Sequence, residues 1–186
     1  MTNQILAEVT MPITRLNHAV LYVRDLDRSV RFYSEVLGFR VIPMTPDGFK
    51  GAAFLQAPAS INDHDLGLFE IGSQADASGA GRSTVGLYHL AWEVDTLAEL
   101  ERLAGVLTES SALGGASDHG TTKSLYGADP DGLEFEIAWI VPAERLDDDA
   151  LAARKRIGRL DLEAEKERYG ADTPGGIRSH DERAPA

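Results

Sequence analysis

The sequence predicts an α+β protein built from two βαβββ modules, and three observations support this fold class. The stretch "LNHAVLYVRDL" at 16–26 reappears as "LYHLAWEVDTL" at 87–97, so that His18 and His89 occupy equivalent places 71 positions apart. In both copies, a strand pattern is followed by a helix pattern and then by short β-rich runs. A Gly/Ser-rich connector at 73–86 separates the copies and has the composition of a turn or loop.

The first module is expected over about residues 13–72. "HAVLYV" (18–23) is an apolar run typical of a buried strand. "DLDRSVRFYSEVLG" (25–38) has apolar residues at helical spacing and ends at Gly38, a common helix stop. Three further β-rich runs follow: "FRVIP", "GAAFLQ" and "DLGLFEIG".

The second module is expected over about residues 86–142 and repeats this order. "YHLAWEV" predicts a strand, and Thr96 followed by Glu99 predicts the start of a helix by their capping-box spacing. The strand signal near 113–116 is weak. "KSLYGA" and "LEFEIAWIV" predict two strands around the turn sequence "DPDG". Residues 1–142 are therefore expected to form one domain.

A charged, helix-prone tail follows at 143–186 and is expected to be partly helical. Two arrangements of this tail are open at this stage. It can cover its own domain or a second subunit, or it can extend freely into the solvent.

Composition excludes several classes of function. The 186 residues carry a net charge of −12, which argues against nucleic acid and anionic membranes because both require a basic surface. No apolar run is long enough for a transmembrane helix, and "MTNQILAEVT" lacks the features of a signal peptide. Cysteine is absent, so neither disulfides nor thiol chemistry are available. We therefore expect a cytoplasmic protein whose partner is a small molecule.

Two histidines and one carboxylate are the main candidates for chemistry. His18 and His89 lie in strands that are apolar on both faces, so both rings are expected to be largely removed from water and to need a hydrogen-bond partner or a metal. Considered singly, each histidine is also explained as a core residue, and Glu136 as a solvent-facing carboxylate. If both modules line one cleft, the three residues can converge as the two-histidine, one-carboxylate set of non-haem Fe(II) enzymes.

Four stretches together resemble the vicinal oxygen chelate superfamily, which includes glyoxalase I, bleomycin-resistance proteins and type I extradiol dioxygenases. They are "LNHAVLYVRDLDRSVRFYSEVLGF", "HDLGLFEIG", "GLYHLAWEV" and "DHGTTKSLYGADPDGLEFEIAW", and they cover about residues 13–142. The resemblance implies that the paired modules form an open, cup-shaped sheet around a divalent metal. It is nearest to the extradiol catechol dioxygenases, which implies Fe(II) bound by His18, His89 and Glu136, with Mn, Ni or Zn as alternatives.

The same resemblance implies roles for three other residues. His64, just before an apolar strand, matches the acid/base histidine. Tyr126, ten residues before Glu136, matches the tyrosine that hydrogen-bonds the substrate oxygen, and His119 lies shortly upstream as in the family. The implied activity is cleavage of a catecholic ring with O2, in aromatic catabolism, by a homodimer. Structural explanations also exist, with His64 at a loop edge, His119 in a turn and Tyr126 as a strand aromatic.

Two other functions are also open, and Glu70 bears on the first of them. "LFEIG" resembles "EFEIA", which suggests that Glu70 corresponds to Glu136 and is a fourth ligand, as in a glyoxalase I-like isomerase or lyase with Ni or Zn. An extra carboxylate would fill a coordination position that oxygen chemistry requires, and the isomerase assigns no role to His64 or Tyr126. A metal-free drug-binding protein would have no need for the two histidines and Glu136.

Overall fold

The computed structural model describes residues 13, 15–44, 50–80 and 83–176. Its first module has the predicted βαβββ order. Strand β1 pairs in parallel with β4, and the antiparallel pairs β4–β3 and β3–β2 complete a sheet of order β1-β4-β3-β2. The elements are β1 (Ala19–Val23), α1 (Leu26–Arg31), the π-helical η1 (Phe32–Val36), β2 (Arg40–Ile42), β3 (Ala52–Gln56) and β4 (Leu66–Glu70).

The second module repeats this topology in a sheet of order β5-β8-β7-β6. The predicted α+β class of paired βαβββ modules is thus confirmed, and the two four-stranded sheets do not close into a barrel. The elements are β5 (His89–Glu93), α2 (Leu97–Glu109), β6 (Leu113–Asp118), β7 (Thr122–Ala128) and β8 (Glu134–Ile140). The weak strand signal near 113–116 corresponds to β6, whose pairing with β7 is irregular between Leu113 and Gly115.

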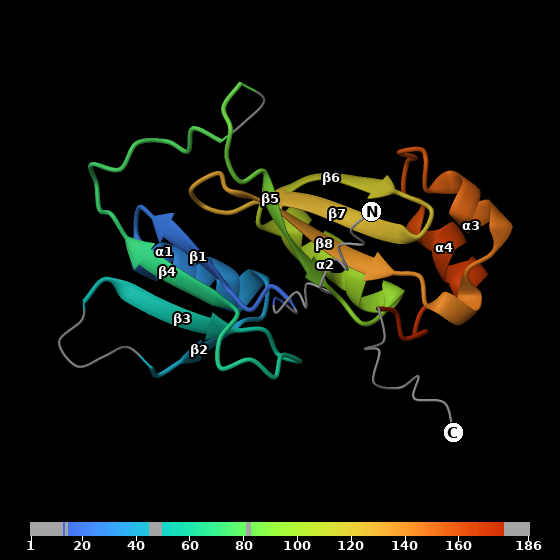
Figure 1. The fold of residues 1–186 in the computed structure, drawn as a ribbon, viewed down its shortest axis with the longest axis horizontal. Helices are drawn as coiled ribbons and strands as arrows, with labels where there is room; N and C mark the ends of the chain where they lie inside the picture. Colours follow the sequence, from blue (N-terminus) through green and yellow to red (C-terminus); the bar gives the residue numbers. More distant parts are fainter. Residues whose placement is uncertain (1–12, 14, 45–49, 81–82, 177–186) are drawn as a thin grey trace, which may run out of the picture.

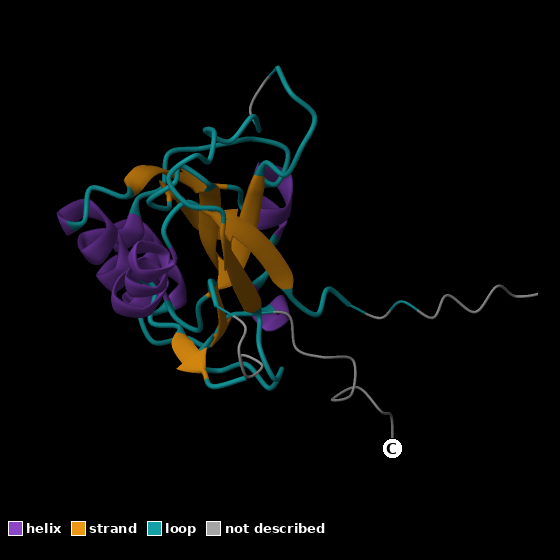
Figure 2. Ribbon diagram, turned by 90° about the vertical axis from the view of Figure 1, so that its left-hand side faces the viewer, coloured by secondary structure: helices purple, strands orange, loops and turns teal. Residues whose placement is uncertain are grey.

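After the second module, the described residues up to 176 form the short helical elements η2 (Ala143–Arg145), α3 (Asp148–Ala153) and α4 (Leu162–Tyr169). Figure 1 shows the two sheets side by side, with α3 and α4 at the far end of the second sheet. Helices gather beside the strands, as the turned view in Figure 2 shows. Within the described residues, no helix is both long and apolar enough to cross a membrane.

Local sequence explains where the main helices begin. The side chain of Asp25 accepts a hydrogen bond from the Arg28 amide, and that of Thr96 accepts one from the Glu99 amide at 3.1 Å, as the capping pattern predicts. The helix expected at 25–38 is α-helical only to Arg31 and continues as η1. Phe32, at the start of η1, packs against the apolar cores of both modules.

The modules contact each other through their helix-covered sides. The Tyr33 hydroxyl donates to Asp129 of the second module at 3.1 Å, and the Arg24 amide donates to Asp131 at 2.7 Å. Phe39 meets Trp92 edge to face, with ring centroids 5.0 Å apart. Because apolar and polar contacts both cross this boundary, the two sheets are held in a defined arrangement.

Candidate functional site

Three neighbouring strands of the second module bring His89, Glu136 and Ser124 together. Nε2 of His89 lies 3.1 Å from Oε2 of Glu136, and the Ser124 hydroxyl donates to Oε1 of Glu136 at 2.5 Å. The Glu136 side chain is 13% exposed and that of His89 is 25% exposed. Glu136 is therefore not the solvent-facing carboxylate that strand alternation alone allows, because both its oxygens have polar partners.

Tyr126 and His119 extend this cluster. Tyr126 lies opposite Glu136 in the β7–β8 register, and its hydroxyl is 2.8 Å from Nε2 of His119. Burial raises the pKa of the Tyr126 phenol, and the nearby charge of Glu136 raises it further. The phenol therefore remains protonated at neutral pH and is available as a hydrogen-bond donor.

In the first module, His18 and His64 lie against each other. Their ring centroids are 4.4 Å apart, and the edge of Phe54 faces the His64 ring at 5.1 Å. His64 is buried, but His18 is exposed. The expectation that the His18 ring would be largely removed from water is wrong, because none of the other described residues covers the face of β1 that carries it.

The loop before β4 holds His64 in place through the buried carboxylate of Asp65. One Asp65 oxygen accepts from the Ala57 amide at 2.8 Å, and the other accepts from Ser60 at 2.8 Å and from Asn62 at 2.7 Å. All three hydrogen bonds are accepted by Asp65, which fixes the conformation of the loop. His64, which directly precedes Asp65, is therefore a buried residue beside His18 and not a surface residue at a loop edge.

The structure thus divides the predicted residues into two groups, one in each module. Among the residues that the structure describes, no three His, Cys, Asp or Glu side chains lie close enough to share one metal ion. His18 consequently does not join His89 and Glu136 within a single chain as described. Each group supplies only part of the predicted ligand set.

The donor atoms nevertheless fit a metal ion. Nδ1 of His18 is 2.7 Å from the side-chain oxygen of Asn17, and when it donates to that oxygen Nε2 carries the free lone pair. Nε2 of His89 faces Oε2 of Glu136 at 3.1 Å, so these two donor atoms point into the same space. Nδ1 of His64 is buried and has no hydrogen-bond partner among the described residues, although Oδ1 of Asp63 lies 3.5 Å from it. Buried polar atoms without partners are uncommon and mark positions where a ligand is expected.

Strand register corrects the proposed correspondence between Glu70 and Glu136. In β5–β8, Ala91 pairs with Glu136, and Val20, the residue equivalent to Ala91 in the repeat, pairs with Gly67 in β1–β4. The first module therefore has glycine, not Glu70, at the position of Glu136. Glu70 instead accepts a hydrogen bond from the Leu26 amide at 2.9 Å, at the start of α1.

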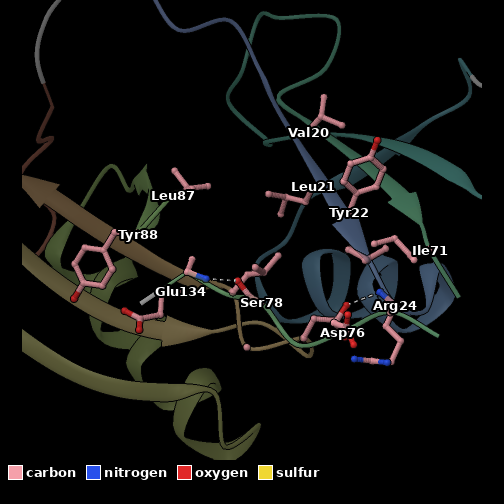
Figure 3. Close-up of a pocket in the computed structure, with 16 residues that line it drawn as sticks. Val20, Leu21, Tyr22, Arg24, Ile71, Asp76, Ser78, Leu87, Tyr88 and Glu134 are labelled. Atoms are coloured by element: carbon pink, nitrogen blue, oxygen red, sulfur yellow. Dashed lines mark hydrogen bonds between the residues drawn. The ribbon is translucent and has the colours of Figure 1, made fainter. Parts of the chain in front are cut away.

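A cavity of about 370 Å³ lies between the modules, beside the polar cluster rather than over it. Figure 3 shows Val20 and Tyr22 of β1 on one side of it, and Leu87, Tyr88 and Glu134 on the other. Tyr88 connects the cavity to the cluster, because its ring centroid is 4.7 Å from that of His89.

Sequence reasoning did not identify Ser124 or Asn17 as part of the site. Ser124 is two residues before Tyr126, so strand alternation puts both on the same face, and this signal was available. Asn17 directly precedes His18 and carried no recognisable pattern. Both residues act on a predicted ligand rather than as ligands, and contacts of this kind depend on side-chain orientation.

Paired βαβββ modules, each with a histidine at or just before its first strand, define the fold class of this protein. A family model described as the Glyoxalase/Bleomycin resistance protein/Dioxygenase superfamily matches residues 15–137. The chain belongs to this superfamily. The resemblance inferred from the sequence motifs is thereby confirmed.

Individual relatives differ in function. A catechol-2,3-dioxygenase of Bacillus subtilis (strain 168) is 31% identical over 131 residues, which is 67% of this chain but 41% of the relative, so the chain spans well under half of that protein. A glyoxalase/dioxygenase structure from Nostoc punctiforme has a TM-score of 0.56 at 24% identity, covering 74% of this chain and 97% of that one. A lactoylglutathione lyase structure from Agrobacterium tumefaciens has a TM-score of 0.50 at 20% identity, covering 69% and 95%. These structural similarities establish the fold alone.

Proposed function

We propose that this protein is an extradiol-type dioxygenase that cleaves a catecholic ring with O2 at an Fe(II) ion bound by His18, His89 and Glu136. The observation that carries the proposal is the cluster of His89 and Glu136 beside the Tyr126–His119 pair. The Bacillus subtilis relative, named for this activity, adds support. Both oxygen atoms of O2 enter the ring-opened product, so the reaction needs no external reductant.

The ligand set favours this chemistry over that of an isomerase. Gly67 at the position equivalent to Glu136 means that the repeat supplies one carboxylate instead of two. Two histidines and one carboxylate leave open coordination positions for a substrate and O2. Fe(II) bound there would supply the one-electron chemistry that allows a chelated catechol to react with O2.

The chain's own residues would bind the substrate and move its protons. Tyr126 would donate its phenolic hydrogen to a substrate oxygen, and His119 would fix the orientation of that phenol through their 2.8 Å contact. His64 would accept a proton from the second catechol hydroxyl at Nδ1, which is buried, makes no hydrogen bond among the described residues and lies 3.5 Å from the Asp63 carboxylate. An imidazole is suited to this task because its ordinary pKa is close to neutral pH.

We further propose that the complete site forms in a homodimer, in which His18 of one copy meets His89 and Glu136 of another. The His18-bearing face of β1 supports this, because Val20 and Tyr22 on it are 52% and 73% exposed. Leu87 and Tyr88, next to His89, are 55% and 66% exposed. Exposed apolar side chains on both groups are typical of surfaces that a partner covers.

Metal content and turnover test the activity together. We expect anaerobically reconstituted protein to bind iron and to convert catechols to yellow ring-cleaved products. His18→Ala, His89→Ala and Glu136→Gln should lose iron, whereas His64→Ala should retain iron and lose turnover. Glu109→Gln is the matched control, since Glu109 is an exposed glutamate at the end of α2 and lines neither the cavity nor the polar cluster. Nickel or zinc dependence with no ring cleavage would refute the proposal, as would full activity of His64→Ala.

Complementation tests the dimeric site. Chains carrying His18→Ala and His89→Ala are co-expressed with different tags, and the mixed dimer is isolated. It keeps one intact set of ligands if the site lies between copies, so we expect one iron per mixed dimer and none in either single variant. An iron-free mixed dimer, alongside a wild type that binds iron, would place the whole site within one chain.

A further inference from the structure

Lys123 in β7 is fully buried although it carries a charge. Its Nζ lies 2.5 Å from Oδ1 of Asp118 and 2.9 Å from Oε2 of Glu165, a residue of α4. It also lies 5.6 Å from the ring centroid of Tyr169, in the same helix. A buried lysine is rarely found without such partners. The ion pair therefore ties the C-terminal segment, defined here as residues 143–176, to the second sheet.

The C-terminal segment also holds the turn between β6 and β7. The backbone amide and carbonyl of Asp118 both pair with Gly158, at 2.9 and 2.8 Å. Gly120, in the same turn, has φ of +75°, and a Cβ there would collide with the carbonyl oxygen of Ala150 in α3. The turn is consequently packed directly against the C-terminal segment, with no room for a side chain between them.

This turn carries His119. The His119 amide donates to the Thr122 carbonyl at 2.9 Å, and Asp118, the preceding residue, accepts from both Lys123 and the Gly120 amide. On the opposite face of β7 from Lys123 lies Tyr126, whose hydroxyl meets His119. The ion pair and the His119–Tyr126 pair are therefore connected through one short turn.

We propose that Lys123 and Glu165 are positioning residues, through which the C-terminal segment fixes His119 against the Tyr126 hydroxyl. The catalytic meaning of this contact rests on the proposed dioxygenase function, but the structural coupling does not. The segment lies outside the stretch matched by the family model, which ends at residue 137. The segment thus supports the turn that carries His119 from outside the stretch that the family model matches.

Full-length Glu165→Gln tests the coupling, with Glu163→Gln as the matched control. Glu163 lies in the same helix, is 76% exposed and pairs with Lys166 rather than Lys123. The ring nitrogens of His119 are followed by NMR of histidine-labelled protein, with the signal assigned from its loss in His119→Asn. We expect Glu165→Gln to shift the His119 resonances and to lower kcat by about ten- to a hundredfold, as a small misplacement does, with iron content unchanged. Glu163→Gln should match the wild type in all three measurements.

A second variant separates positioning from simple stability. Lys123→Met combined with Glu165→Met removes the two most buried charges of the cluster, while Asp118, whose side chain is 25% exposed, keeps its bond from the Gly120 amide. Replacing a buried ion pair by apolar residues is often neutral for stability. We expect this double variant to unfold within a few degrees of the wild type while the His119 resonances remain displaced. Wild-type His119 resonances in both variants would overturn the proposal. Because NMR requires no turnover, this outcome is distinguishable from a protein that simply lacks dioxygenase activity.

Discussion

Ser124→Ala provides a direct test of how the candidate site holds its carboxylate. The Ser124 hydroxyl is fully buried and donates to Oε1 of Glu136 at 2.5 Å, while Oε2 faces His89. A hydrogen bond to a charged acceptor contributes about 1.5–3 kcal/mol. Each 1.4 kcal/mol corresponds to about a tenfold change in a binding constant. Removing the hydroxyl should therefore weaken metal binding about 10- to 100-fold, in line with the usual effect of losing a partner of a metal ligand.

Metal binding is measured by anaerobic calorimetric titration of the apo-protein with Fe(II). Ser117→Ala is the matched control, because Ser117 pairs with Ser124 across β6 and β7 but makes no side-chain hydrogen bond among the described residues. It should bind Fe(II) as the wild type does. If Ser124→Ala also binds within twofold of the wild type, the carboxylate is not oriented by this bond, and the geometric argument for the site fails.

Three further predictions concern the fold. Burial raises the pKa of the Asp129 carboxyl, so the folded protein holds this proton more tightly than the unfolded chain does. The resulting contribution to the free energy of unfolding is fully present at low pH, and it is lost as pH rises from the ordinary value of about 3.9 through the raised pKa. Urea unfolding from pH 4 to 8 should show this loss in the wild type and a flatter profile in Asp129→Asn; equal slopes would contradict it. Leu100→Ala removes a fully buried side chain from the apolar core of the second module and should lower the free energy of unfolding by about 2–5 kcal/mol. Thr96→Ala removes the cap of α2 and should cost about 1 kcal/mol in the same assay, whereas no change would show that the cap is dispensable.

Much of the fold could be predicted because its signals are local. The repeat around His18 and His89 set two equivalent modules, and the period of apolar residues distinguished strands from helices. Thr96 marked the start of α2 because a capping side chain acts within one turn. The change from α1 to η1 has no local sequence signal, and it coincides with Phe32, which packs against the cores of both modules.

The site was only partly predictable for a related reason. Similar strings, "LFEIG" and "EFEIA", suggested that Glu70 and Glu136 are equivalent, but strand pairing aligns Gly67 with Glu136 instead. A strand's register is decided by its partner and by which face is buried, and neither is encoded in five consecutive letters. The buried position of Lys123 escaped notice because its partner Glu165 is distant in the sequence.

By itself, the sequence determined the module order, the α+β class and the residue types available for chemistry, because these follow from periodicity, capping and composition over short distances. Only the tertiary structure decided that His18 and His64 form one group and that His89 and Glu136 belong to another, and that the C-terminal segment supports the turn carrying His119. Those outcomes depend on how separate elements pack, since side chains far apart in the chain interact only once the backbone has brought them together.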